Sequence, residues 1–478
     1  MPIAKGRHGA RAASELLIAT LLLAWPALYN GFPILYPDSM TYLDDGRIVA
    51  RALFLRHFSE YYGMRSFIYS LGILPFHWNL TAWPIVALQC FLVAYVLRLV
   101  VRSLAPAFMT PRLASAVFLT LILLLSAFTS VSWFSCLVLP DILGSLVYLA
   151  FFLVAFAPAT LTRLERYSLY LIAWWGIASH ASHLILAGAL CVVIAAILSV
   201  QRQSLRRTFR TTTEVAAIVA IAAGSQLALN AYLYGHPSLN GERPPFLMAR
   251  VIADGPGRWY LEKHCGELNW TICKHVRSLN TDPDIFLWSP DGTWESASDD
   301  EQQQMLDEEI PLVIATLRTY PQAQISRSAG NFWEQLKTFG FNDLDPSSWV
   351  LDQFATVMPA ARASYLRSRQ ANRNLPLDDM TTFQFWIVIG SLGMLAVFAL
   401  LLGRAISARL AALTLITAFV VVANAAVTGI LSMPEDRFEC RVIWMTPFLS
   451  LLFAMAWVDK RVGARRGKAV SARATTAQ

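Results

Sequence analysis

Residues 16–40 read LLIATLLLAWPALYNGFPILYPDSM, an apolar run that ends close to a Pro-Asp pair. The apolar stretch from residue 14 to residue 31 approaches the ~20 residues that cross about 30 Å of hydrocarbon. Similar runs follow along the chain. Of its 478 residues, 56% are hydrophobic and 15% are charged, whereas soluble proteins average roughly 25% charged residues. We therefore expect an all-α polytopic membrane protein.

The apolar runs predict about ten membrane-spanning helices, by the length criterion for a spanning segment. Their predicted ranges are 14–31, 82–102, 113–132, 140–158, 167–179, 184–200, 212–233, 382–403, 410–431 and 441–457. Residues 66–78 are apolar but too few to span, so we expect a re-entrant or juxtamembrane segment that ends near Pro75. No Ala-x-Ala cleavage pattern follows the first run, which predicts a retained anchor rather than a signal peptide.

Lysine and arginine gather at one set of helix ends, while the opposite short loops, 133–140 and 180–183, carry none. The positive-inside rule then predicts that both termini are cytoplasmic and that residues 30–65 and 234–380 face outward. The net charge of +7 follows from this topology and from contact with anionic lipid in the bilayer, and it does not indicate nucleic acid.

Three regions result from this division. Residues 1–233 form a transmembrane module with a catalytic first outer loop at 32–65, residues 234–380 form a mixed extracytoplasmic domain, and residues 381–478 form closing helices with a basic tail.

Cys265 and Cys273 lie eight residues apart in the outer domain, and an exported compartment permits a disulfide between them. Cys136 and Cys440 both fall at predicted outer helix ends, and a second bond there is left open.

Two acids follow a proline at the predicted outer face. Asp38 follows Pro37 and opens a stretch that alternates apolar residues with arginine, typical of a helix lying in the membrane surface. Asp141 follows Pro140 at the same predicted side and depth. Either acid can serve as a helix cap, but ionisable groups at this level of a membrane protein are costly and often functional.

Two further groups of polar residues fall at outer helix ends. The stretch MPEDRFECRVIWMTPFL, residues 433–449, brings together Glu435, Arg437 and Arg441. Guanidinium groups bind phosphate bidentately, so these arginines are candidates for a lipid-phosphate clamp, with ion pairing inside the protein as the alternative. SHASH, residues 179–183, places His180 and His183 on one helical face, where they either pack as polar residues or contact a ligand.

Four of these stretches together resemble the C-type glycosyltransferase superfamily, which includes aminoarabinose transferases and protein O-mannosyltransferases. They are YPDSMTYL (36–43), RSFIYSLGIL (65–74), LPDILGSLVYLAFF (139–152) and DRFECRVIWMTPFLSLL (436–452). They are similar to the family's first loop acid, its Arg-Pro-x-x-Tyr segment, its second loop acid and its arginine before a closing helix. The proline of that segment is missing after Arg65. Ser39 stands where the family has another acid.

The resemblance implies a membrane glycosyltransferase that takes a sugar from a polyprenyl-phosphate donor and gives it to a glycan, lipid or protein acceptor. With it we expect a bacterial inner-membrane protein whose active site faces the periplasm. It implies a base at Asp38, an orienting acid at Asp141, donor-phosphate ligands at Arg65, Arg437 and Arg441, and substrate contacts at Tyr42, His180, His183 and Glu435. One base without a nucleophile predicts inversion. A divalent metal ion could share in neutralising the phosphate, so the cofactor is left open.

Two other classes of function compete with this interpretation. A glycan polymerase or ligase acting on lipid-linked oligosaccharide would share the long outer loop and the arginines, but it has no need of an acid directly after the first helix. A transporter or flippase would place ionisable residues or broken helices near the membrane midplane, whereas the charges here gather at helix ends.

Overall fold

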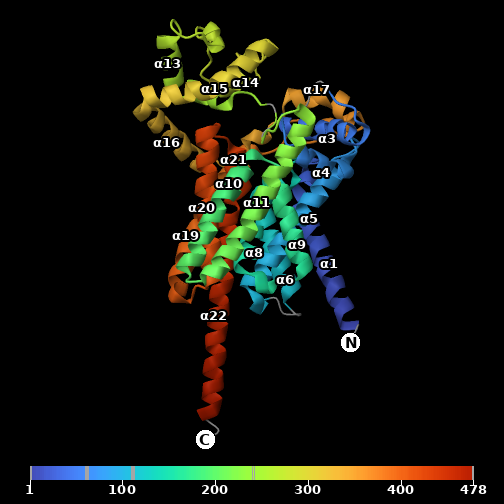
Figure 1. The fold of residues 1–478 in the computed structure, drawn as a ribbon. Coiled ribbons are helices and arrows are strands. Elements are labelled where there is room, and N and C mark those ends of the chain that lie inside the picture. The colour runs from blue at the N-terminus through green and yellow to red at the C-terminus, as the bar shows by residue number, and fades with distance from the viewer. Residues whose placement is uncertain (1–2, 60–63, 109–112, 240, 242, 476–478) are drawn as a thin grey trace. The chain divides into compact units, whose positions relative to one another are not determined.

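The computed structural model describes residues 1–478 except 1–2, 60–63, 109–112, 240, 242 and 476–478 (Figure 1). The side chains of residues 3–9 and 463–475 also lie outside the description. The predicted cytoplasmic charges of Lys5, Arg7 and the basic tail after residue 462 therefore fall there.

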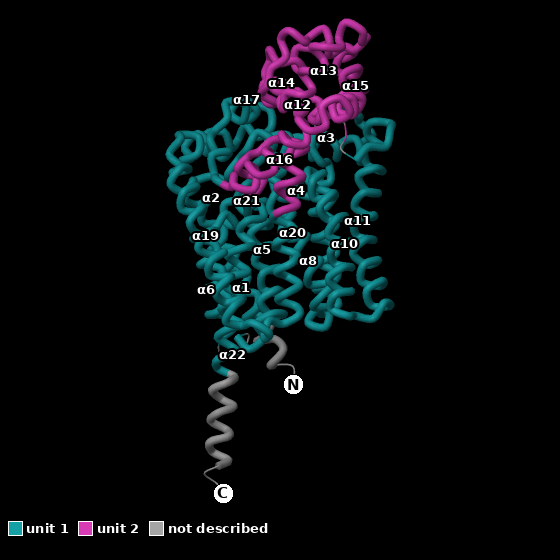
Figure 2. Tube along the Cα trace, turned by 90° about the vertical axis from the view of Figure 1, so that its left-hand side faces the viewer, with its two compact units in different colours: residues 1–239, 340–421, 440–478 teal, residues 240–339, 422–439 magenta. Residues whose placement is uncertain are grey.

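The regular secondary structure of the described chain is helical, apart from one isolated parallel bridge between Ile34 and Leu137. It divides into two compact units, shown in different colours in Figure 2. Unit 1 consists of residues 1–239, 340–421 and 440–478, and unit 2 of residues 240–339 and 422–439. The predicted all-α class is thus confirmed.

The helices of unit 1 up to residue 239 are α1 (Ile3–Leu23), α2 (Trp25–Asn30), α3 (Pro37–Leu55), α4 (Phe67–His77), α5 (Trp83–Leu104), α6 (Ala114–Phe128), α7 (Val131–Cys136), α8 (Asp141–Phe156), α9 (Arg163–Ala178), α10 (Ala181–Val200) and α11 (Leu205–Tyr234). Those of its later segments are α17 (Ser348–Val357), α18 (Arg362–Leu366), α19 (Leu377–Leu402) and α22 (Met445–Thr475). Two helices contribute residues to both units, α20 (Ala408–Leu431) and α21 (Asp436–Ile443). Short 3-10 turns cover Pro106–Phe108, Pro158–Thr160, Asn342–Leu344, Pro359–Ala361 and Gly403–Ala405.

Six helical segments of the described chain are long and apolar enough to cross a membrane. They are Trp83–Leu104, Ala181–Val200, Leu205–Tyr234, Leu377–Ala405, Ala408–Leu431 and Asp436–Val462. The shorter apolar helices are Phe67–His77, Ala114–Phe128 and Asp141–Phe156. Each of the ten predicted ranges coincides with a helix or a consecutive helix pair, but the number of spans stays a prediction.

Helix α8 forms the centre of unit 1, because all 16 of its residues are buried. A helix that is apolar all round is expected inside a bundle, and α8 packs against α5, α9, α10 and α11. Helix α9 approaches closely where Gly176 faces α8: a Cβ at this position would lie 2.7 Å from Val147 Cγ2. Small residues allow this kind of close helix approach in membrane proteins.

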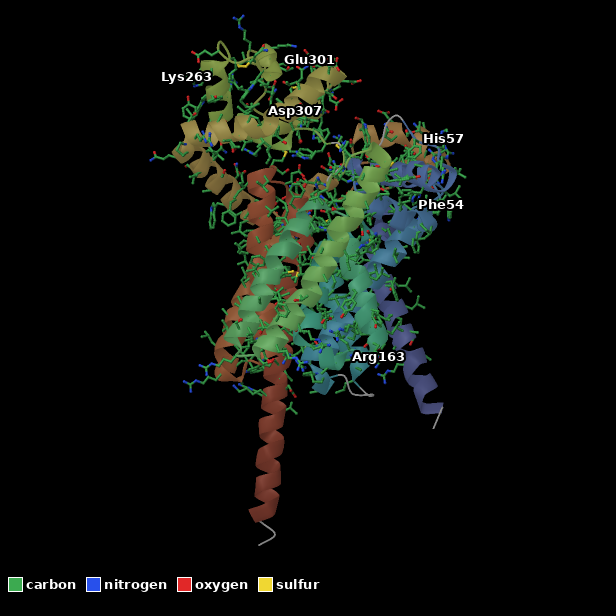
Figure 3. All side chains as sticks on the ribbon, in the orientation of Figure 1. Phe54, His57, Arg163, Lys263, Glu301 and Asp307 are labelled. Atoms are coloured by element: carbon green, nitrogen blue, oxygen red, sulfur yellow. A yellow bond between two sulfur atoms is a disulfide. The ribbon has the colours of Figure 1, made fainter. Side chains whose placement is uncertain are left out.

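The predicted first outer loop and the short apolar segment after it form helices α3 and α4. Their placement at a membrane surface stays a prediction. Helix α3 buries Leu43, Val49 and Ala52 and leaves Phe54 exposed near its end, as a surface-lying amphipathic helix would. Figure 3 shows Phe54 and His57 at the end of unit 1 opposite to Arg163, the first residue of α9. The short apolar segment predicted at 66–78 is α4.

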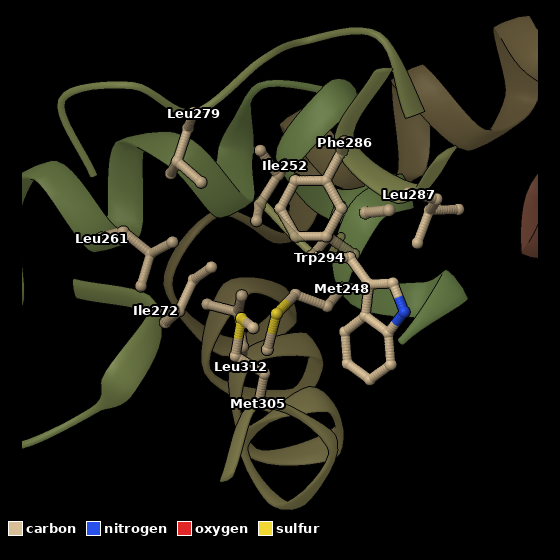
Figure 4. Packing of buried hydrophobic residues seen from close by; sticks show 12 residues of the cluster. Met248, Ile252, Leu261, Ile272, Leu279, Phe286, Leu287, Trp294, Met305 and Leu312 are labelled. Atoms are coloured by element: carbon tan, nitrogen blue, oxygen red, sulfur yellow. The ribbon is translucent and has the colours of Figure 1, made fainter. Parts of the chain in front are cut away.

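Unit 2 contains α12 (Phe246–Ala253), α13 (Pro256–His264), α14 (Pro283–Trp288), α15 (Asp299–Thr319), α16 (Pro321–Lys337) and a 3-10 turn, Thr271–His275. Sequence signals are clear for α15, where Ser298 and Glu301 exchange side-chain-to-backbone hydrogen bonds in a capping box. Figure 4 shows the buried apolar cluster of this unit, whose labelled members are Met248, Ile252, Leu261, Ile272, Leu279, Phe286, Leu287, Trp294, Met305 and Leu312.

The cysteines divide as their positions suggest. Cys265 and Cys273 are joined by a disulfide in unit 2. The second bond that the sequence leaves open is absent, because the Cys136 thiol lies on the Leu23 carbonyl and the Cys440 thiol on the Gly340 carbonyl. Both thiols are buried, so each acts as a small core side chain with a weak donor.

Candidate active site

Two Pro-Asp turns meet in unit 1. The segments before them run in parallel: the Ile34 amide donates to the Cys136 carbonyl at 3.1 Å, and the Val138 amide donates to the Ile34 carbonyl at 3.0 Å. Helix α3 begins three residues after Ile34, and α8 begins three residues after Val138. The bridge therefore brings the starts of both helices, and with them Asp38 and Asp141, to the same end of unit 1.

Asp38 is the second residue of α3, and the helix cap is Tyr36. The Asp38 carboxylate instead accepts a hydrogen bond at 2.5 Å from Arg65, which stands just before α4. Both side chains keep partial exposure, 14% for Asp38 and 22% for Arg65. Arg65, which the resemblance predicts to bind the donor phosphate, thus holds Asp38, the predicted base, at a place that solvent reaches.

Asp141 is the first residue of α8, following Pro140 in the cap position. Its Oδ1 lies 3.5 Å from Arg441 Nη1, and the two side chains are 4% and 0% exposed. Arg441 also donates from Nη2 to the Ser182 hydroxyl at 3.0 Å, and the Ser145 hydroxyl donates to its carbonyl oxygen. This second pair is enclosed by protein, where removal of one charge leaves the other buried.

The two histidines lie at the start of α10, with ring centroids 5.2 Å apart. His180 caps the helix, since its Nδ1 accepts from the Ser182 amide. His183 is fully buried, and its Nδ1 lies 2.8 Å from the Gly176 carbonyl, which assigns the ring proton to Nδ1. Its Nε2 faces Gly144, one turn into α8, and has no hydrogen-bond partner among the described residues.

A pair of tyrosines connects the two acids. Tyr42 lies one helical turn after Asp38, is buried, and packs edge-to-face on Tyr69 at 4.8 Å. Tyr69 on α4 interacts electrostatically with Asp141 and donates to Gln89 at 2.9 Å. Gln89 in turn donates to the Leu137 carbonyl next to the bridge. Sequence reasoning missed Tyr69 and Gln89 as members of the site, although Tyr69 is the tyrosine of the quoted RSFIYSLGIL stretch.

The remaining predicted residues, Glu435 and Arg437, belong to unit 2. Arg437 Nε lies 2.9 Å from a Glu435 carboxylate oxygen, and both side chains are largely buried. The Gln335 side chain accepts from the Glu435 amide and donates to its carbonyl, which fixes this turn on α16. Asp284 joins the group: desolvation raises its pKa to about 6, with repulsion from Glu435 and Asp282 adding to the shift and Arg437 opposing it. In the sequence, only the Asp-Pro-Asp pattern at 282–284 could have indicated that Asp284 belongs to this group.

Metal-ligating side chains do not gather in the part of the chain that the structure describes. No three or more His, Cys, Asp or Glu residues there lie close enough together to hold an ion. The polar groups of the site are instead organised as two arginine–aspartate pairs with tyrosine and histidine between them.

Comparison with known proteins identifies no family for the chain. No family model matches the chain, and no curated protein or solved structure is significantly similar to it.

Proposed function

We propose that the protein is a membrane glycosyltransferase that moves a sugar from a polyprenyl-phosphate donor to an acceptor hydroxyl with inversion. The observation that carries this proposal is the juxtaposition of two Pro-Asp turns, each acid beside its own arginine. A lipid phosphate sits at headgroup level because its chain lies in the bilayer. A base that serves it must therefore stand at a membrane face, as an acid at the start of a surface-lying helix does.

The partial exposure of Asp38 supports its role as the base. Asp38 takes the proton of the acceptor hydroxyl while that oxygen bonds to the anomeric carbon. The bond from this carbon to the phosphate oxygen breaks, and polyprenyl phosphate leaves with the electron pair. General base catalysis of this kind typically contributes about 10²–10⁴-fold in rate. Arg65 holds the carboxylate in place.

The enclosure of Asp141 supports an orienting role rather than proton transfer. Asp141 and Ser182 together fix the Arg441 guanidinium. Arg441 neutralises the charge that develops on the leaving phosphate, which preorganised donors do well in a site shielded from water. The resemblance gives the same role to Arg437. Tyr42, His180, His183 and Glu435 contact the substrates, and a divalent ion brought with the donor would share the charge.

The same proposal covers topology and location. The chain spans a bacterial inner membrane with about ten helices, as the apolar run lengths suggest. Both termini are cytoplasmic, and the active site faces the periplasm. The separation of Arg163 from Phe54 and His57 along unit 1 supports this sidedness (Figure 3), because basic residues favour the cytoplasmic side.

Turnover by purified protein tests the function. The protein, reconstituted in lipid, is given polyprenyl-phosphate sugars labelled in the sugar, and release of unlabelled polyprenyl phosphate is followed together with labelled product. We expect release that depends on an acceptor and is lost in Asp38→Asn. Donor that moves between leaflets intact would indicate a transporter. Joining of lipid-linked oligosaccharides with release of a polyprenyl pyrophosphate would indicate a polymerase or ligase.

A further inference from the structure

Helix α16 buries polar side chains and exposes an apolar stripe, which lies beside the exposed charged residues Arg327, Glu334 and Lys337. Gln324 and Gln335 are buried, at 4% and 0% exposure, whereas Ile325 and Trp333 are 63% and 58% exposed. A helix on the surface of a water-soluble domain has the opposite arrangement. An exposed apolar stripe of this kind is the side that a membrane protein presents to hydrocarbon.

Specific contacts hold the helix in this orientation. Gln324 donates to Asp254 Oδ2 at 2.6 Å, and Asn331 donates to Asp254 Oδ1 at 2.9 Å. Farther along, Gln335 bonds to both the amide and the carbonyl of Glu435. Buried polar groups require such partners, so the polar contacts of α16 determine that Ile325 and Trp333 face outward.

The apolar side of α16 lies next to the outer part of α20, one of the candidate membrane spans. The backbones approach closely at Gly429, where a Cβ would lie 2.7 Å from the Asn331 carbonyl oxygen. Between the helices runs a groove of about 410 Å³, with a lining that includes Leu317, Ile325, Phe332, Val422, Ala426 and Ile430. All of these residues belong to unit 2, drawn in magenta in Figure 2.

We propose that this groove holds the hydrocarbon chain of the polyprenyl-phosphate donor, with its phosphate at Arg437. The inference rests on the proposed function for the identity of the lipid. Three features favour this occupant: the groove is continuous with a membrane-spanning helix, its lining is apolar, and α16 also fixes the Glu435 turn that precedes Arg437. The phosphate takes the place of Glu435 as the partner of Arg437.

Chain-length dependence tests the groove directly. Binding of undecaprenyl phosphate and of geranyl phosphate to the full-length protein is measured by native mass spectrometry. Ala426→Phe fills the groove, and Ile325→Gln alters an exposed position whose replacement leaves the core of unit 2 intact. Each should weaken undecaprenyl phosphate at least about tenfold, since each removes apolar contact with several methylenes of the long chain, and should leave geranyl phosphate unchanged. Ala418→Phe, at an exposed position elsewhere on α20, is the matched control and should affect neither lipid.

An equal loss for both lipids, or no loss for either, in the folded variants would overturn the proposal. A second measurement identifies the lipid: photo-crosslinking with a diazirine-bearing undecaprenyl phosphate should label peptides from residues 317–332 or 422–430. Unlabelled undecaprenyl phosphate should protect them, and excess phosphatidylglycerol should not; protection by phosphatidylglycerol would assign the groove to ordinary bilayer lipid. These readouts need no turnover. Chain-dependent binding without sugar transfer would therefore refute the glycosyltransferase while keeping the groove.

Discussion

The two Pro-Asp turns of unit 1 have nearly the same local sequence and different surroundings. Asp38 and Arg65 form a short ion pair that keeps contact with solvent, whereas Asp141 and Arg441 form a longer pair that protein encloses almost completely. Exposed ion pairs contribute little to stability because water solvates both charges. Enclosed pairs become costly when one partner is lost. Under the proposed function, this contrast assigns proton transfer to Asp38 and the holding of a guanidinium to Asp141.

The largest expected effect follows from removing the enclosed acid. Asp141→Leu leaves Arg441 buried without its carboxylate and should lower the free energy of unfolding by about 3–5 kcal/mol. Denaturant unfolding of the protein in detergent measures it.

The double variant Asp141→Leu with Arg441→Met should recover most of this loss, because two apolar side chains can replace a buried ion pair. Asp38→Leu provides the comparison and should cost less than Asp141→Leu, because water reaches both Asp38 and Arg65. Equal losses for Asp141→Leu and Asp38→Leu would break the distinction between the two turns.

Substitution of Asp38 should lower activity but not stability, whereas substitution of Asp141 lowers stability. Asp38→Asn keeps the size of the side chain but cannot accept a proton, so turnover of a lipid-linked sugar should fall about 10²-fold or more. Its unfolding free energy should stay near that of the parent. Steady-state release of polyprenyl phosphate provides the rate.

Asp141→Asn is the matched variant. Its loss of turnover should accompany a loss of stability, because Asp141 acts through Arg441. If folded Asp38→Asn retains activity within a few-fold of the parent, Asp38 is not the base, and its ion pair with Arg65 is only structural.

The contact between Gly144 of α8 and His183 tests the packing around the enclosed Asp141–Arg441 pair. A Cβ at Gly144 would lie 2.8 Å from His183 Nε2, so Gly144→Ala should push the imidazole against the Asp141–Arg441 pair. Overpacking of this kind costs about 1–3 kcal/mol. Gly188→Ala, where nothing lies within 4 Å of the added Cβ, should be neutral or slightly stabilising, since alanine favours a helix. Thermal unfolding of the two variants provides the test, and equal destabilisation would argue against the contact.

The smallest effect concerns a third acid, Asp284 in unit 2, whose pKa desolvation raises from 3.8 to about 6. Between these values the folded state binds more protons than the unfolded state, so the contribution of Asp284 to stability falls as pH rises from about 4 through 6. Part of the Asp284 side chain stays in contact with water, which screens the interactions that shift its pKa, so we expect less than about 1 kcal/mol.

Unfolding of the parent and of Asp284→Asn across pH 4–8 measures the Asp284 contribution as a difference. The parent should lose stability relative to the variant as pH rises. A difference that is independent of pH would show that Asp284 titrates alike in the folded and unfolded states.

The sequence by itself determined where the helices lie and which of them are unusual. Length and apolar content specify a spanning segment, so α5, α10 and α20 follow from their own residues. The short α4 and the amphipathic α3 follow in the same way from a run too short to span and from spaced arginines. The Cys265–Cys273 disulfide needed only the eight-residue spacing in one small loop. The positions of Asp38 and Asp141 after prolines were equally visible.

Only the tertiary structure decided which partners these groups have. Asp141 meets Arg441 across 300 residues of chain, and the bridge from Ile34 to Leu137 spans about a hundred. The outward apolar face of α16 depends on Asp254, 70 residues before Gln324. Local periodicity reports which face of a helix is apolar, but it does not report whether protein, water or lipid covers that face. The physical reason is that burial and pairing are properties of the packed chain, set by the long-range contacts that exclude water from one acid and admit it to the other.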